Sequence, residues 1–112
     1  MESTRQKKIS RLLQKDLAII FQMDAPAILG SFMFTITGVR VSPDLSVAKV
    51  YLSIFPSDDS KKLMEQVKEK SPFFRNLLAK KVRHQLRIIP ELHFYLDDSA
   101  DYADKINRLL KE

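Results

Sequence analysis

The order in which helical and strand-like patterns follow one another constrains the fold of this chain more than any other feature. Apolar residues recur at helical spacing near the N-terminus, and two segments dense in β-branched and aromatic residues, 32–41 and 47–55, then follow. Helical spacing returns on both sides of Ser71-Pro72, and alternation returns at 90–96. This order predicts an α+β fold, α-β-β-α-kink-α-β plus a C-terminal helix, with a three-stranded sheet packed on helices.

The first helix is predicted at about residues 4–22. Ser3 and Gln6 have the spacing of a capping box, and Ala25-Pro26 ends the pattern because a residue before proline disfavours helical geometry. The strands at 32–41 and 47–55 are joined by a predicted tight turn at Pro43 and Asp44. In the second strand one face is predicted to be buried, through Ala48, Val50, Leu52 and Ile54.

Two helices joined by a sharp kink are predicted after residue 56. Acidic residues favour a helix start at 56–59, and Ser71-Pro72 interrupts that helix while also suiting an N-cap and first-turn pair. A strand at 90–96 follows, and a last helix is predicted to start in the acidic block that contains Asp97, Asp98 and Asp101.

Composition limits the class of protein. The 112 residues suit one domain, 1–112, and 45% hydrophobic with 29% charged residues is typical of a folded chain. The absence of cysteine excludes disulfides and cysteine chemistry and fits a reducing compartment. No apolar run approaches the ~20 residues that span a bilayer. We therefore expect a cytoplasmic protein with no membrane partner, no targeting signal and no secretion.

The positive charge is concentrated in two segments. The net charge is +5, and residues 5–15 and 75–87 each hold five Lys or Arg and no acid, whereas 91–104 holds five acids and neither Lys nor Arg. One basic stripe consists of Lys8, Arg11 and Lys15 on the first helix. The third helix, predicted to begin at the Ser71-Pro72 break, is expected to carry a continuous basic outer face beside that break. This face is formed by Lys80, Arg83, His84 and Arg87.

Such stripes suit phosphate contacts with nucleic acid, although either stripe alone is also typical of a solvated helix face. The presence of both stripes favours a nucleic-acid partner. Because the stripe of the third helix is predicted to lie beside the Ser71-Pro72 break, we expect that helix to contribute more to recognition than the first. Unpaired bases could stack on strand aromatics, most of which are expected in the core: Phe32, Phe34, Tyr51, Phe55 and Tyr95.

Metal and catalytic sites are not predicted. The cluster Asp97, Asp98, Asp101 and Asp104 lacks the glycine of a calcium loop and suits a helix start. His84 and His93 have no third ligand at a recognisable spacing, so zinc is not expected either. There is no glycine-rich phosphate loop and no nucleophile motif. The sequence therefore indicates a binding protein without enzymatic activity, cofactor or small-molecule substrate.

Three segments together resemble the ribosome-binding factor A family. They are ITGVRVSPDLSVAKVYLSIF, FFRNLLAKKVRHQLRIIPELHFYLDDS and, more weakly, RQKKISRLLQKDLAIIF. The resemblance implies a KH-like fold of the second topology. It also implies a non-enzymatic, cold-important factor for late maturation of the small ribosomal subunit and processing of its RNA. The partners would be that subunit and its ribosomal RNA, bound by a protein that is monomeric when free.

The sequence departs from the family at the break. KH domains have a glycine-rich loop there, and the resembling family has a kinked helix pair with alanine and glycine, but this chain has Lys70-Ser71-Pro72. Lys70 and Arg75 could supply side-chain contacts instead. The full set of RNA-binding candidates is Arg5, Lys7, Lys8, Arg11, Lys15, Lys70, Ser71, Arg75, Lys80, Lys81, Arg83, His84 and Arg87. A basic adaptor for an acidic protein is the alternative, and an enzyme is a third, less favoured hypothesis.

Overall fold

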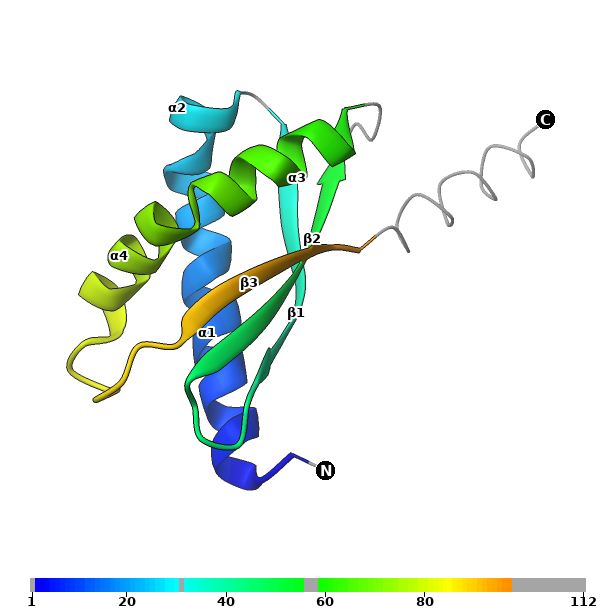
Figure 1. Ribbon diagram of the computed structural model, residues 1–112. Helices are drawn as coiled ribbons and strands as arrows, with labels where there is room; N and C mark the ends of the chain where they lie inside the picture. Colours follow the sequence, from blue (N-terminus) through cyan, green and yellow to red (C-terminus); the bar gives the residue numbers. More distant parts are fainter. Residues whose placement is uncertain (1, 31, 56–58, 98–112) are drawn as a thin grey trace.

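The computed structural model describes residues 2–30, 32–55 and 59–97 (Figure 1). Its elements are α1 (Thr4–Met23), α2 (Ala25–Leu29), β1 (Met33–Val41), β2 (Val47–Phe55), α3 (Ser60–Glu69), α4 (Ser71–Val82) and β3 (Glu91–Leu96). The predicted α+β class and the order α-β-β-α-kink-α-β are confirmed. The predicted C-terminal helix, and all of the aspartate cluster except Asp97, lie outside the described residues.

The sheet has the order β1-β2-β3 and is mixed. β1 and β2 form an antiparallel hairpin, whereas β3 pairs in parallel with β2. A parallel pair needs a long crossover between its strands, and α3 and α4 supply it. The register of β1 against β2 shifts between Ile36 and Gly38, so Thr37 is an extra residue in β1.

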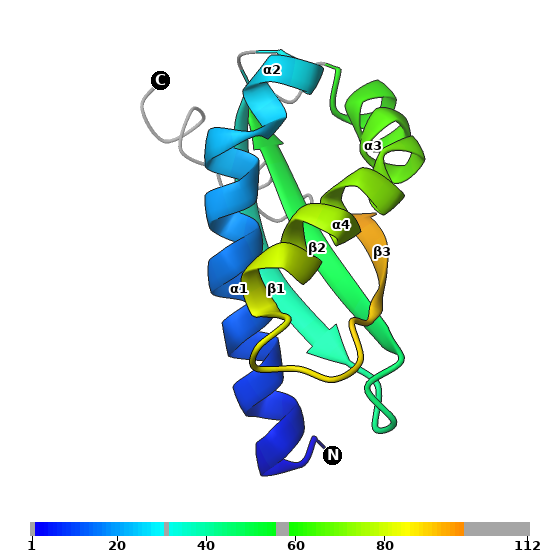
Figure 2. The ribbon, with the colours of Figure 1, turned by 90° about the vertical axis from the view of Figure 1, so that its left-hand side faces the viewer.

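The helices cover one face of the sheet. α1 runs along β1, α4 lies beside α1, and α3 and α4 both contact β3. Figure 2 shows α1 and α4 in front of the strands on this side. The predicted alternation in β2 is confirmed, because Ala48, Val50, Leu52 and Ile54 are buried beneath the helices. The opposite face of the sheet is not covered by any of the described helices.

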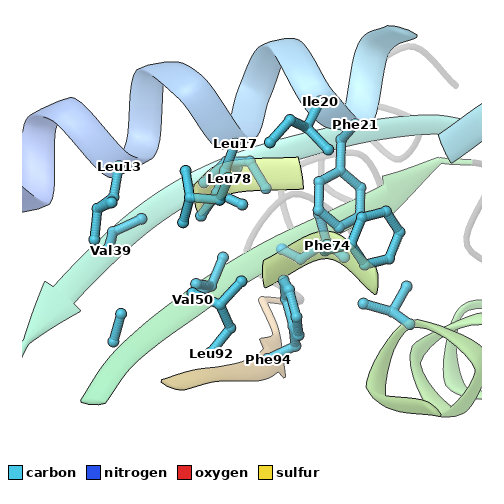
Figure 3. Packing of buried hydrophobic residues seen from close by; sticks show 14 of the residues in the cluster. Leu13, Leu17, Ile20, Phe21, Val39, Val50, Phe74, Leu78, Leu92 and Phe94 are labelled. Atoms are coloured by element: carbon cyan, nitrogen blue, oxygen red, sulfur yellow. The ribbon is translucent and has the colours of Figure 1, made fainter. Parts of the chain in front are cut away.

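A cluster of aromatic rings forms the centre of the core. Phe21 of α1 stacks on Phe74 of α4 with ring centroids 4.5 Å apart, and Phe94 of β3 meets both rings edge-on (Figure 3). Aromatic pairs in these geometries add about 0.5–1.5 kcal/mol each beyond the area they bury. Every described helix and strand contributes to the same hydrophobic cluster. The helices are therefore held against the sheet chiefly by apolar packing.

The predicted capping box at the start of α1 is confirmed. The Gln6 amide nitrogen donates to Ser3 Oγ, and the Ser3 amide nitrogen donates to Gln6 Oε1 at 2.8 Å. The Gln6 side chain also donates from Nε2 to the Val41 carbonyl at 2.9 Å. One buried side chain thus fixes both the first turn of α1 and its position against the end of β1.

The end of α1 differs in part from the prediction. α1 ends at Met23, one residue beyond the predicted end, with Asp24 as its C-cap, but the chain then forms α2, a short helix that we did not predict. Pro26 lies in the first turn of α2, where a missing amide hydrogen costs nothing. The proline therefore ends one helix and opens the next, and Ala25 and Leu29 bury α2 against the core.

The predicted turn between β1 and β2 is confirmed. Asp44 Oδ1 accepts hydrogen bonds from the Ser42 hydroxyl at 2.7 Å and from the Ser46 hydroxyl at 2.8 Å. These bonds favour the charged carboxylate and lower the pKa of Asp44 below its ordinary value. Leu45 adopts a left-handed conformation with φ of 63°, which lets the chain reverse within the turn.

Within the described part of the chain, no helix combines the length and the apolar character that a membrane span requires.

Candidate nucleic-acid interface

α1 presents its basic residues away from the sheet. Its buried side is formed by Gln6, Ile9, Ser10, Leu13, Leu17, Ile20 and Phe21, and the basic residues lie on the exposed sides of the helix. Those exposed residues are the five candidates Arg5, Lys7, Lys8, Arg11 and Lys15. We call Lys8, Arg11 and Lys15 the α1 stripe. Lys7 lies on a different side, lining a groove with Arg40 and Lys49 from the hairpin.

The predicted continuous face on the third helix is wrong. α4 ends at Val82, with Arg83 as its C-cap, so His84 and Arg87 lie in the loop that leads to β3. The Val82 carbonyl accepts the amides of Gln85 and Leu86, which turns the chain out of the helix. Leu86 and Ile89 then pack against the core. Helical spacing therefore stops applying after residue 82.

These cations also lie farther from the break than predicted. α4 has 12 residues and spans roughly 18 Å, with the break at one end and Arg83 at the other. Lys80, Lys81, Arg83, His84 and Arg87 are all exposed, and we call this group the α4-loop cluster. The geometric reason for ranking the third helix above the first therefore fails. The α1 stripe and Lys80 nevertheless face the same way. The helices α1 and α4 are neighbours on the same face of the sheet, and each one buries the side that lies opposite these basic residues.

The break is a joint of one residue. Lys70 caps the end of α3 and the start of α4, with its amide bonded to the Gln66 carbonyl and its carbonyl to the Phe74 amide. Ser71 does not act as the predicted side-chain N-cap. It is already the first residue of α4, and its hydroxyl donates to the Leu92 carbonyl of β3 at 3.1 Å. That bond fastens the joint to the sheet.

Arg75 has a structural contact that the sequence did not indicate. Its Nε donates to the Pro90 carbonyl at 3.2 Å, and its Nη2 donates to the Ile89 carbonyl at 2.8 Å. Two of its five N–H donors thus hold the loop after α4 in place. Ser71 and Arg75, both RNA-binding candidates, therefore already bond the protein's own backbone.

A groove lies between the break and β3. It is lined by Lys68 and Ser71 on the helix side and by Leu92, His93, Phe94 and Tyr95 on the strand side. α4 begins here, so the partial positive charge of its N-terminus lies at the groove, beside the partial negative charge of the C-terminus of α3. Lys70 is exposed at the joint beside it. Lys68 and His93 were not among the predicted RNA-binding residues, because only the crossover brings α3 next to β3.

The basic residues are not neutralised by neighbours. Within residues 2–30, 32–55 and 59–97, the one short contact between a basic and an acidic side chain joins His93 Nε2 to Glu91 Oε2 at 3.7 Å. The described lysines and arginines therefore present their charge to solvent or, for Arg75, to backbone carbonyls. Such charge is available to a polyanion. No group of three potential metal ligands occurs in the described part of the chain.

Comparison with known proteins identifies the family. The family model described as ribosome-binding factor A matches residues 5–110 of this chain. The chain is also 45% identical to the ribosome-binding factor A of Cytophaga hutchinsonii, over 100% of this chain and 84% of that protein. This chain belongs to the ribosome-binding factor A family. A second member, from Christiangramia forsetii, is 42% identical over 98% of this chain and 85% of its own length.

Structures described as ribosome-binding factor A share the fold. A solution structure of a Thermotoga maritima protein described as a ribosome-binding factor A matches with a TM-score of 0.63 and 28% identity, covering 85% of this chain and 89% of that one. A Thermus thermophilus ribosome-binding factor A homology model, fitted into a cryo-EM map of its complex with the 30S subunit, matches with a TM-score of 0.62. It is 26% identical and the match covers 80% of this chain and 91% of that one.

Proposed function

We propose that this protein binds the RNA of the small ribosomal subunit and assists late maturation of that subunit and processing of its ribosomal RNA. The observation that carries the proposal is membership of the ribosome-binding factor A family over nearly the whole chain. A relative of 26% identity is described in a complex with the 30S subunit. The exposed lysines and arginines on α1, at the break and after α4 support an RNA partner.

The proposed mechanism is binding by charge and shape, without catalysis. The α1 stripe and the α4-loop cluster would contact phosphates on one side of the molecule. The groove at the break would admit the RNA backbone close to the start of α4, where Lys68 and Lys70 add charge. We further propose that the protein acts in the cytoplasm as a monomer, as one domain, and that its loss is felt most in the cold.

Sedimentation of cell extract tests this function. We expect the protein to migrate with small subunits, to be enriched on immature ones, and to be absent from translating ribosomes. Mild ribonuclease treatment should release it. Survival of the association after complete RNA digestion would instead support the alternative, an adaptor that holds an acidic protein. Migration with mature translating ribosomes would contradict an assembly role.

A further inference from the structure

The face of the sheet that none of the described helices covers carries two rows of side chains that suit an RNA strand. Residues paired across a sheet share a face, and Arg40 pairs with Lys49, which pairs with His93. Two residues along each strand, Gly38 pairs with Tyr51, which pairs with Tyr95. A row of basic side chains therefore lies about 7 Å from a row that contains two aromatic rings.

The two tyrosines form a stack that is open on one side. Their ring centroids are 5.7 Å apart and their planes differ by 29°. Tyr95 lies on one side of Tyr51, and on the other side the neighbouring residue is Gly38, which has no side chain. A β-carbon at Gly38 would lie 3.9 Å from Tyr51 Cδ2, so almost any other residue would cover that side of the ring.

A hollow of about 370 Å³ lies at this open side. It is lined by Thr37, Gly38, Arg40, Tyr51 and Asp97. The Thr37 hydroxyl donates to Asp97 Oδ2 at 2.6 Å, so part of the lining consists of polar groups bonded to each other. Arg40 also lines a separate groove, where two further cations, Lys7 and Lys49, lie together with Glu2.

We propose that one unpaired RNA base enters this hollow, stacks on Tyr51 as the third member of the Tyr95-Tyr51 stack, and has an adjoining phosphate held by Arg40 and Lys49. The ring supplies a surface that accepts any base, and the two cations, which lie together on one side of the ring, match the charge of the adjoining backbone. Thr37 and Asp97, which are hydrogen-bonded to each other, line the hollow beside the place of the base. This inference takes RNA as the partner from the proposed function, but it names a separate subsite on the opposite side of the sheet from α1.

Gly38→Val provides the sharpest variant. Gly38 is not in the left-handed region, and valine suits a strand, so the fold should be retained while the new side chain fills the hollow. Tyr51→Leu is the second variant, because it removes the ring and keeps an apolar side chain. Phe73→Leu is the matched control. The exposed fraction of Phe73 is 40%, close to the 41% of Tyr95 in the proposed stack. Phe73 belongs to α4, however, and so lies on the side of the sheet that the helices cover.

The probe is a single-stranded oligocytidylate of about six nucleotides, compared with the same oligonucleotide in which the sugars carry no bases. The full-length protein should bind the intact oligonucleotide about tenfold more tightly, since stacking on one aromatic ring is worth roughly 1–3 kcal/mol. Gly38→Val and Tyr51→Leu should lower affinity to that for the abasic oligonucleotide. Phe73→Leu should leave it unchanged. Circular dichroism and melting temperature check the fold of each variant.

Three outcomes would overturn the inference. The first is equal affinity of the unaltered protein for the intact and the abasic oligonucleotide. The second is a folded Gly38→Val variant that still discriminates between them. The third is a set of Tyr51 ring resonances that do not shift at saturating RNA. Association with small subunits is measured separately with the same proteins. Base discrimination without that association would preserve the stacking site and refute the proposed function instead.

Discussion

Gln6 is the residue that joins the start of α1 to the end of β1. Its side chain completes the capping box with Ser3 and donates to the buried end of β1 at Val41. The first role could be predicted from the spacing of Ser3 and Gln6. The second could not, because it depends on where β1 ends against α1, which is set by contacts 35 residues apart in the chain.

We predict that Gln6→Leu lowers the free energy of unfolding by about 1–3 kcal/mol. Leucine has similar size but leaves the Val41 carbonyl and one helix N-terminal amide without this partner. Gln14→Leu is the control, because Gln14 also donates to a β1 carbonyl, that of Ile36, but is only half-buried. Urea denaturation of both variants provides the measurement. Equal destabilisation of the two variants, or none for Gln6→Leu, would contradict the prediction. It would show that the buried hydrogen bond from Gln6 to the Val41 carbonyl adds little to the free energy of unfolding.

At the scale of helices and strands, local patterns predicted most boundaries closely. α1 was expected at residues 4–22 and spans Thr4–Met23, and the second strand was expected and found at 47–55. These elements have strong periodicity and local signals at their ends. The errors lie where distant contacts decide. Residues 83–87 continue a helical pattern, but packing of Leu86 and Ile89 and the bonds from Arg75 draw them into a loop.

The binding surface was predicted less completely than the fold. The basic residues of α1 are exposed as expected, but the groove at the break combines Lys68 with His93, which come together only through the parallel pairing of β3. The hollow beside Tyr51 likewise depends on the register shift at Thr37. Spacing along one element cannot reveal which residues of another element stand opposite it.

We predict that cations at the break contribute more to RNA affinity, per residue, than those on the α1 stripe or in the α4-loop cluster. Lys68 and Lys70 stand beside a groove and the start of α4, whereas the other two groups lie on exposed outer faces. Replacing both by alanine should weaken binding by about 1.5–3 kcal/mol for each hydrogen bond to a phosphate that the change removes. Binding to small-subunit RNA is measured by filter retention at fixed salt.

The comparison variants are two triple alanine substitutions, one at Lys8, Arg11 and Lys15 and one at Lys80, Arg83 and Arg87. Each removes more charge than the Lys68 and Lys70 pair, so net charge alone predicts that each triple variant binds more weakly. Alanine favours helix at Lys8, Arg11, Lys15 and Lys80, and none of the replaced side chains is buried, so folding should be preserved. A larger fall in affinity for either triple variant, with unchanged circular dichroism, would place the main recognition surface on the outer helix face.

At the scale of the whole molecule, we predict that neither folding nor RNA binding requires a metal ion. The core is a continuous apolar cluster, and the described residues contain no set of three metal-ligating side chains. Chelator should therefore leave the melting temperature and RNA affinity unchanged when RNA folding is controlled separately. A rise in melting temperature of the isolated protein on adding calcium or zinc would contradict this prediction, because a ligand stabilises the state that binds it.

The most direct test of the central claim is titration of the purified protein against isolated small ribosomal subunits at several salt concentrations, with large subunits as the control. If about five phosphates of unpaired RNA are neutralised, the plot of log affinity against log salt should have a slope near −3.5, at ~0.7 per contact. We predict that slope and a clear preference for small subunits. A flat slope, or equal affinity for large subunits, would contradict a small-subunit RNA-binding factor that acts through its exposed cations.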